Sequence, residues 1–204
     1  MSADRSGAQP AARTGNSRAA GDPDLDAVRA AQADRAAFAA LYRRYLDRVY
    51  AYAFYQLGDH HDAEDATERT FLAALRALPE FDDRGASFRA WLFRIAHNTI
   101  ANAHRTRARR RTEVLPAGLE RAAPDADPAG LVSRADEQRA VRQAIGRLPE
   151  DRRQVVLLRF VDGLSSREIG LVLGRSPGAV RVLLHRSLRD LAGLLDATLL
   201  DGDR

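Results

Sequence analysis

Apolar side chains recur every three or four residues along most of this 204-residue chain, and the strict alternation typical of a strand is nearly absent. That spacing is typical of amphipathic helices because it collects the apolar positions on one face. Ala, Leu and Arg, which all favour helix, dominate the composition. The pattern therefore predicts an all-α protein.

Helix-breaking residues divide the first half of the chain into three expected helices. The first begins near Asp24 and ends at Gly58-Asp59. The second follows that break and ends at Pro79, because proline cannot continue a helix. A polar loop over residues 81–86 comes next, and Ser87 can cap the third helix.

The composition changes sharply over residues 112–134, where Pro and Gly recur often enough to break any long helix. This segment reads as a flexible linker between two small helical domains, 24–111 and 135–197. Residues 1–23, rich in Ala, Gly, Ser, Arg and Pro, are expected to be a disordered tail, and 198–204 a short C-terminal tail.

The C-terminal domain contains the signature of a helix-turn-helix. Ser165 and Glu168 have the spacing of a capping box, Gly174 permits a turn, and Ser176-Pro177 can begin a second helix. The apolar positions expected to face inward from that second helix are Val180, Leu183, Leu184, Leu188 and Leu191. The second helix of such a motif enters the major groove of DNA.

The charge of this region favours a nucleic-acid partner. Residues 152–189 contain eight arginines and two acidic residues, a net charge of +6 that exceeds the +4 of the whole chain. DNA phosphates bind to concentrated basic patches of this kind. The alternative is a small helical bundle with a solvated basic face. The residues expected to contact DNA are Arg175, Ser176, Arg181, Val182, His185 and Arg186.

Two helices of the N-terminal domain differ in charge. The second begins with five acids, Asp59, Asp62, Glu64, Asp65 and Glu68. The third contains six arginines and no acid between residues 94 and 111, with Asn98 and Asn102 among them. Arg suits phosphate and Asn suits base edges, so one face fits DNA and another fits a basic protein. Two solvated helix faces are the alternative.

Several kinds of site are not expected. The chain has no Cys, which excludes disulfides and thiolate metal ligands. The adjacent His60 and His61 diverge on a helix, so we predict no metal site and no cofactor. A phosphate-binding Gly loop and a nucleophile with a base are both missing, so no catalytic residue is expected. No apolar run approaches the roughly 20 residues that span a bilayer, which favours a cytoplasmic protein without membrane insertion.

Four sequence blocks resemble a known family. Asp62-Ala-Glu-Asp-Ala-Thr-Glu-Arg-Thr-Phe71 and Phe88-Arg-Ala-Trp-Leu-Phe-Arg-Ile-Ala-His-Asn98 resemble the second domain of bacterial sigma factors. Residues 148–160 and 163–170 resemble their fourth domain. The short linker is similar to that of the extracytoplasmic-function (ECF) group, which lacks the third domain.

The resemblance implies three surfaces. The acidic helix would dock on the β′ clamp helices of core RNA polymerase, and the helix-turn-helix would read the −35 element of promoter DNA and touch the β flap. The third helix and the loop before it would read and open the −10 element. The implied docking residues are Asp62, Asp65, Glu68, Thr70 and Phe71, and the implied −10 residues are Arg94, Asn98, Asn102 and Arg105.

This chain departs from the family's pattern at two places. Arg69 stands where an acid is usual, and Val182-Leu183 replaces a small polar residue followed by a basic one. An anti-sigma partner is usual in the group. A plain helix-turn-helix regulator is the competing function, but it has no need of the acidic block. Helical spacing places Phe88 and Trp91 in the core rather than against melted bases.

Overall fold

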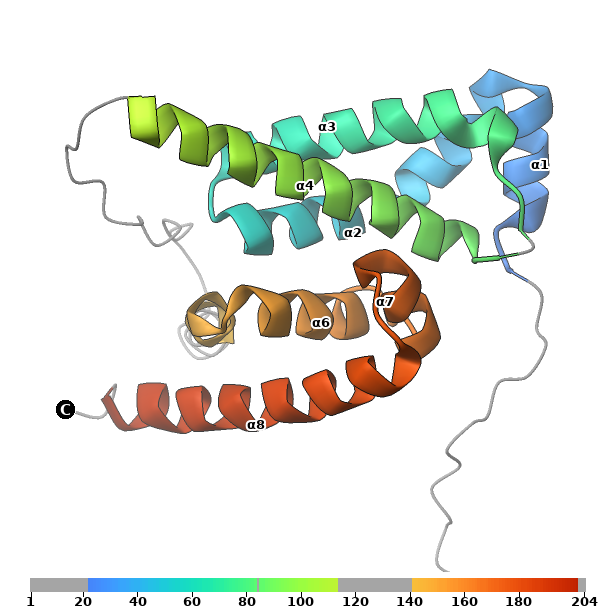
Figure 1. Cartoon of the computed structure of the whole chain (residues 1–204). Helices are drawn as coiled ribbons and strands as arrows, with labels where there is room; N and C mark the ends of the chain where they lie inside the picture. The colour runs from blue at the N-terminus through green and yellow to red at the C-terminus, as the bar shows by residue number, and fades with distance from the viewer. Residues whose placement is uncertain (1–21, 84, 114–140, 202–204) are drawn as a thin grey trace, which may run out of the picture.

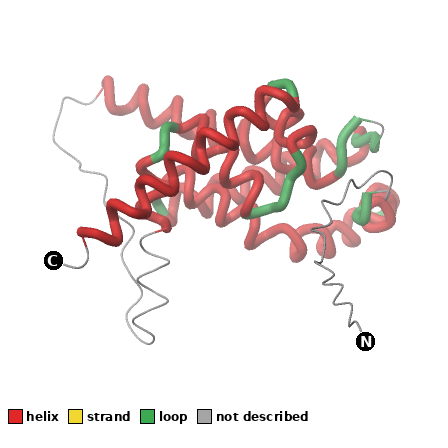
Figure 2. The backbone as a smooth tube through the Cα atoms, turned by 90° about the horizontal axis from the view of Figure 1, so that it is seen from below, coloured by secondary structure: helices red, strands yellow, loops and turns green. Residues whose placement is uncertain are grey.

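This computed structural model describes residues 22–83, 85–113 and 141–201, which form helices and loops without a strand (Figures 1 and 2). The all-α prediction is therefore confirmed. The helices are α1 (Leu25–Ala33), η1 (Arg35–Ala37), α2 (Phe38–Leu57), α3 (His60–Ala77), η2 (Leu78–Glu80), α4 (Phe88–Glu113), α6 (Glu150–Phe160), α7 (Ser166–Leu173) and α8 (Pro177–Asp201). Residues 141–147 are also helical. Nearly all of the expected N-terminal tail and linker lies outside the described residues.

The expectation of a single helix from Asp24 to Gly58 is wrong, because the chain turns at Asp34. That residue is extended, with φ −135° and ψ 116°, and its carboxylate accepts a hydrogen bond from the amide of Ala36 at 2.9 Å. The side chain thus satisfies a helix-start amide, which makes Asp34 the N-cap of η1. Two helices at an angle, α1 and α2, replace one long helix.

The expectation of a tail from residue 198 is wrong in part, because α8 continues to Asp201. The end of α2 and the starts of α3 and α4 agree with the sequence signals. Gly58 ends α2 with a φ of 72°, a left-handed conformation that Gly adopts without strain. Asp59 then caps α3 by accepting from the amide of Asp62 at 2.9 Å. The Ser87 hydroxyl oxygen accepts from the amide of Ala90 at 3.2 Å and caps α4.

Most aromatic side chains of the N-terminal half pack into the core between α2, α3 and α4. Tyr52, Phe88 and Phe93 are fully buried. Trp91 is partly buried and lies with its ring centroid 5.0 Å from that of Phe81 and 5.5 Å from that of Phe88. The expectation that Phe88 and Trp91 are packing residues is confirmed.

The two helical units are in contact. Figure 1 shows α2, α3 and α4 on one side and α6, α7 and α8 on the other, with α7 against α4 and α6 against α2. Their buried apolar residues form one continuous cluster that extends from α1 to α8. The units on either side of the expected linker therefore share a core rather than lying apart.

Candidate nucleic-acid and protein interfaces

Local interactions define the start of α7 and the turn that follows it in the helix-turn-helix. The Ser165 hydroxyl accepts from the amide of Glu168 at 3.2 Å, and the Glu168 carboxylate accepts from the amide of Ser165 at 2.8 Å. Gly174 ends α7 with a φ of 65°. A Cβ added at Gly170 would lie 2.5 Å from the carbonyl oxygen of Arg175, so the turn needs Gly at this position to keep its present geometry. The predicted capping box and turn are confirmed.

Helix α8 begins as expected and presents a basic face. The Ser176 hydroxyl accepts from the amide of Ala179 at 3.2 Å, which leaves that oxygen engaged in the cap. Val182 is 54% exposed. The other candidate DNA-contacting side chains are also exposed: Arg175, Arg181, His185 and Arg186. The structure thus places the predicted residues along one accessible strip at the start of α8.

The inward face of α8 differs from the prediction by one position. Leu188, expected to face inward, is 39% exposed, whereas Ser187 is fully buried. Ser187 satisfies its hydroxyl by donating to the carbonyl oxygen of Leu183 at 2.8 Å. Because this bond stays within the helix, the hydroxyl can enter the core without losing a partner.

Helix α4 carries the second basic face. Arg94, Asn98, Asn102 and Arg105 are all exposed and follow one another at intervals of four, four and three residues. That spacing places them on one side of the helix. The amide oxygen of Asn102 accepts a hydrogen bond from the guanidinium of Arg105, which links two members of the row.

The opposite side of α4 is packed. His97 lies there, with its Nδ1 3.3 Å from the hydroxyl of Tyr52, and burial lowers the pKa of its imidazole. Ile100 is buried one turn further on. Although His97 lies between basic residues in the sequence, it belongs to the core side of the helix and does not contribute to the basic face.

The predicted docking residues on α3 fall into two groups, acids that are at least partly exposed and residues that are buried. Glu68 is exposed, and the side chain of Asp65 is 46% exposed. Asp62 lies in the first turn and is partly exposed. Thr70 is only 1% exposed, and its hydroxyl donates to the carbonyl oxygen of Ala66 at 2.7 Å. Thr70 is therefore a core residue and offers no surface to a partner.

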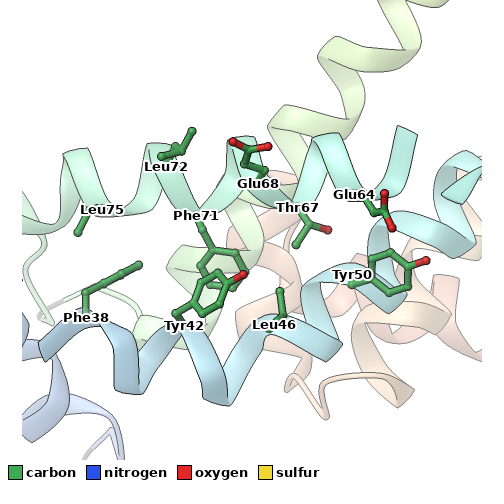
Figure 3. A pocket seen from close by; sticks show the side chains of 10 residues that line it. All are labelled: Phe38, Tyr42, Leu46, Tyr50, Glu64, Thr67, Glu68, Phe71, Leu72 and Leu75. Carbon is green, nitrogen blue, oxygen red and sulfur yellow. The ribbon is translucent and has the colours of Figure 1, made fainter. Parts of the chain in front are cut away.

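A shallow groove of about 370 Å³ runs between α2 and α3, and Glu68 is one of the residues that line it (Figure 3). Phe71, which is 4% exposed, forms part of its floor, and its ring centroid lies 4.7 Å from that of Tyr42. Leu72 is 43% exposed at the edge of the groove, and the carboxylates of Glu64 and Glu68 stand on the same helix. The apolar spacing of this helix predicts Leu72 as a core residue together with Phe71 and Leu75, and for Leu72 that prediction is wrong.

His60 makes aromatic contacts instead of joining a ligand set. Its ring centroid lies 4.4 Å from that of Phe54, and its Nδ1 lies 2.6 Å from the Tyr50 hydroxyl. Within the described ranges, no three His, Asp or Glu side chains are arranged to hold a metal ion. None of the described helices is long and apolar enough to cross a membrane.

Comparison with known proteins distinguishes a sigma factor from a plain helix-turn-helix regulator. Residues 41–110 match the model of sigma-70 region 2, and residues 138–191 match that of sigma-70 region 4. The chain belongs to the ECF sigma factors. Like other members of this family, the factor directs promoter-specific transcription initiation by core RNA polymerase.

Individual relatives agree with that assignment. The ECF RNA polymerase sigma factor BldN of Streptomyces coelicolor is 39% identical over 184 residues, which cover 87% of this chain and 69% of BldN. The ECF RNA polymerase sigma factor SigE of Mycolicibacterium smegmatis is 35% identical over 178 residues, covering 85% of this chain and 68% of SigE.

Solved structures are similar in fold. CnrH, solved in complex with the cytosolic domain of CnrY, is 29% identical with a TM-score of 0.62, covering 85% of this chain and 97% of CnrH. The sigma factor RpoE of Bartonella quintana, solved with the anti-sigma factor NepR, is 23% identical with a TM-score of 0.63. That alignment covers 78% of this chain and 96% of RpoE.

Proposed function

We propose that this sigma factor uses three separate faces: α3 binds core polymerase, α4 reads the −10 element, and α8 reads the −35 element. The observation that carries the proposal is the row of Arg94, Asn98, Asn102 and Arg105 on one exposed side of α4, opposite a packed core. Arg and Asn together supply phosphate contacts and base-edge hydrogen bonds, which a merely solvated helix face does not need.

The polymerase-binding face consists of Asp62, Asp65 and Glu68 with the apolar groove beside them. The acids favour a basic partner, and the groove with Leu72 supplies apolar area next to Glu68, which resembles the mixed composition of protein interfaces. In the family this face meets the β′ clamp helices. Thr70 is left out of the contact surface because it is buried, and Phe71 acts as the floor of the groove.

The −35 face consists of Arg175, Arg181, Val182, His185 and Arg186. Arg side chains bind guanine edges or phosphates, and an exposed Val suits the methyl group of thymine. Ser176 acts through its cap, which positions the first amides of α8 where a phosphate can bind. In the sigma factor family, the same domain also contacts the β flap of polymerase.

The factor performs no chemistry of its own, because polymerase supplies the catalytic site. Its place is the cytoplasm, where its proposed partners, core polymerase and promoter DNA, are found. An anti-sigma factor is a further proposed partner, since CnrH and RpoE were each solved with a bound protein and NepR is an anti-sigma factor by name.

A reconstituted transcription assay tests the proposal. Bacterial core polymerase with the purified factor should initiate at specific promoters from a genomic library, whereas core polymerase alone should not. The factor alone should bind promoter DNA only weakly. Specific DNA binding that neither needs nor recruits polymerase would identify a plain helix-turn-helix regulator instead.

A further inference from the structure

Helix α1 and the residues just before it contact both ends of the loop that precedes α4. We refer to the described residues of this loop, 81–83 and 85–87, as the −10 loop. At its start, the side-chain amide nitrogen of Gln32 donates to the backbone oxygens of Leu78 and Phe81, each at 3.0 Å. At its end, the carboxylate of Asp22, which precedes α1 in the chain, accepts a hydrogen bond from the amide of Phe88. Between these two contacts the loop runs beside α1 (Figure 1).

Helix α1 is itself fixed on the core of the N-terminal unit. The carboxylate of Asp24, which is 2% exposed, accepts hydrogen bonds from the guanidinium of Arg44 and the hydroxyl of Tyr45, both on α2. On the inner face of α1, Val28 and Ala31 are buried. A helix of nine residues is about 14 Å long and does not bend easily. The two contacts with the −10 loop are therefore held at a constant separation.

Aromatic contacts join the two ends of the −10 loop to each other. The ring centroid of Phe81 lies 5.8 Å from that of Phe88, which is fully buried in the core. The residues at the tip of the loop are exposed: Asp82, Asp83 and Gly85. The base of the loop is thus fixed on the core, while its tip faces solvent, where a DNA strand can meet it.

The chemistry of each contact limits which residue can make it. Two carbonyl oxygens face the side chain of Gln32, so this side chain must donate, and a Glu carboxylate of the same shape would repel both oxygens. Gln32 is exposed, so its substitution leaves no cavity in the core. The amide of Phe88 is the first of α4 and has no partner within the helix. Asp22 supplies that partner and places a negative charge at the helix start, where the helix dipole favours it.

A loop that is already ordered binds DNA more tightly than one that must be ordered on binding. Fixing the backbone of a residue costs conformational entropy, and contacts that fix it beforehand remove this cost from the binding step. We propose that Gln32 and Asp22 are positioning residues for promoter recognition, which hold the −10 loop in the conformation that meets the −10 element. Neither residue touches the DNA itself. This proposal rests on the proposed reading of the −10 element by α4 and the loop before it.

The mobility of the −10 loop in the free, full-length factor tests the two contacts directly. The chain has no Cys, so a single spin label can be attached at Asp83→Cys, an exposed position of the loop. In this background, Gln32→Glu and Asp22→Ala should each raise the mobile fraction of the electron paramagnetic resonance spectrum by about two- to fivefold, because each loses hydrogen bonds that hold the loop. A label at Asp47→Cys, an exposed position on α2, should give the same spectrum with and without these substitutions.

Transcription with core polymerase measures what the contacts do for promoter recognition. The rate at a promoter that the factor uses is compared with the rates at single-base variants of its −10 and −35 elements. Gln32→Glu should lower the discrimination among −10 variants by about three- to fivefold and leave the discrimination among −35 variants unchanged. Its competition for core polymerase should also stay at the wild-type level. A substitution that only destabilised the fold would lower all of these rates together.

Two further variants serve as controls. Gln32→Lys keeps a donor for the two carbonyl oxygens and should retain most of the −10 discrimination. Gln143→Glu makes the same chemical change as Gln32→Glu at an exposed position of the C-terminal unit, and should behave as the wild type. Thermal unfolding, followed by far-UV circular dichroism, establishes that each variant is folded at the temperature of the assays.

The outcomes separate this proposal from the proposed function. Unchanged loop mobility in both Gln32→Glu and Asp22→Ala would overturn it, because the contacts would then not hold the loop. Higher mobility with wild-type −10 discrimination, or an equal loss at −10 and −35 variants, would overturn it as well. A wild-type factor that initiates at no promoter would instead count against the proposed function, since the mobility measurements involve neither polymerase nor DNA.

Discussion

The guanidinium of Arg69 donates to the carboxylate of Asp65 at 2.9 Å, so a base partly neutralises an acid within the proposed polymerase-binding face. Both side chains are largely exposed. We predict that Arg69→Glu strengthens binding to core polymerase by about two- to fivefold, since it releases Asp65 and adds a further acid.

Competition with a second sigma factor for a limiting amount of core polymerase measures this change. Arg76→Glu, which lies in the last turn of the same helix, makes the same charge change away from Asp65 and is the matched control. Weaker or equal competition by Arg69→Glu would mean that the pair itself, rather than the acids alone, contacts polymerase.

Substitutions of Thr70 and Glu68 should have opposite effects on stability and on polymerase binding. Thr70→Ala removes a buried methyl group and a hydroxyl, and is expected to lower the free energy of unfolding by about 1–2 kcal/mol. Once folded, that variant should bind core polymerase normally. Glu68→Arg should leave stability nearly unchanged and weaken polymerase binding.

Chemical denaturation and polymerase competition, run on both variants, separate the two effects. If Thr70→Ala weakened polymerase binding while its stability stayed at the wild-type value, the assignment of Thr70 to the core rather than to the docking face would be wrong.

The sequence predicts the backbone correctly where local chemistry determines it. The capping box at Ser165 and Glu168 and the left-handed turn at Gly174 each depend on residues only a few positions apart. The break at Asp34 also depends on a local hydrogen bond, but Ala-rich helical periodicity on both sides concealed it.

Other features depend on partners far along the chain. Ser187 is buried and Leu188 is exposed because α8 packs against α6 and α7. The periodicity of one helix does not indicate where the helices that pack against it lie. In the sequence Arg89 cannot be told apart from the other arginines of its helix, yet it binds acidic residues 73 and 79 positions away. No spacing rule joins residues at such separations, so the contact between the units could not be predicted.

Gly170 provides a stability prediction for the helix-turn-helix. Gly170→Val places a branched Cβ where even a methyl group would lie 2.5 Å from the backbone oxygen of Arg175. We expect this variant to lose about 1–3 kcal/mol of stability and to lose −35-dependent transcription. Gly193→Val, at an exposed site with no atom near an added Cβ, is the control.

Thermal unfolding and transcription from a −35-dependent promoter provide the two measurements. An unfolding temperature equal to that of the wild type would show that the turn adjusts to the larger side chain at little cost.

His97 gives a pH dependence. Burial lowers its pKa below the usual 6.5, so the folded state favours the neutral ring. Above pH 6.5 the ring is neutral in both the folded and the unfolded state, and the free energy of unfolding has its full value. As the pH falls from 6.5 toward the lowered pKa of His97, the unfolded state takes up a proton more readily than the folded state, so the free energy of unfolding decreases. His97→Gln should make stability less sensitive to pH in that window, as followed by thermal unfolding across a pH series. A wild-type slope that the substitution leaves unchanged would assign the dependence to other groups.

Arg181 tests the −35 face most directly, because it is exposed on the first turns of α8 while Val180 beside it is fully buried. If Arg181 contacts a base, Arg181→Ala should cost about 1–3 kcal/mol and relax the preference at one position of the −35 element. If it contacts phosphate, the loss should be similar for every −35 variant. Transcription rates across a set of single-base −35 substitutions distinguish these outcomes, with Arg43→Ala on α2 as the control. If Arg181→Ala transcribed from every one of these promoters at the wild-type rate, Arg181 would not belong to the DNA-binding face.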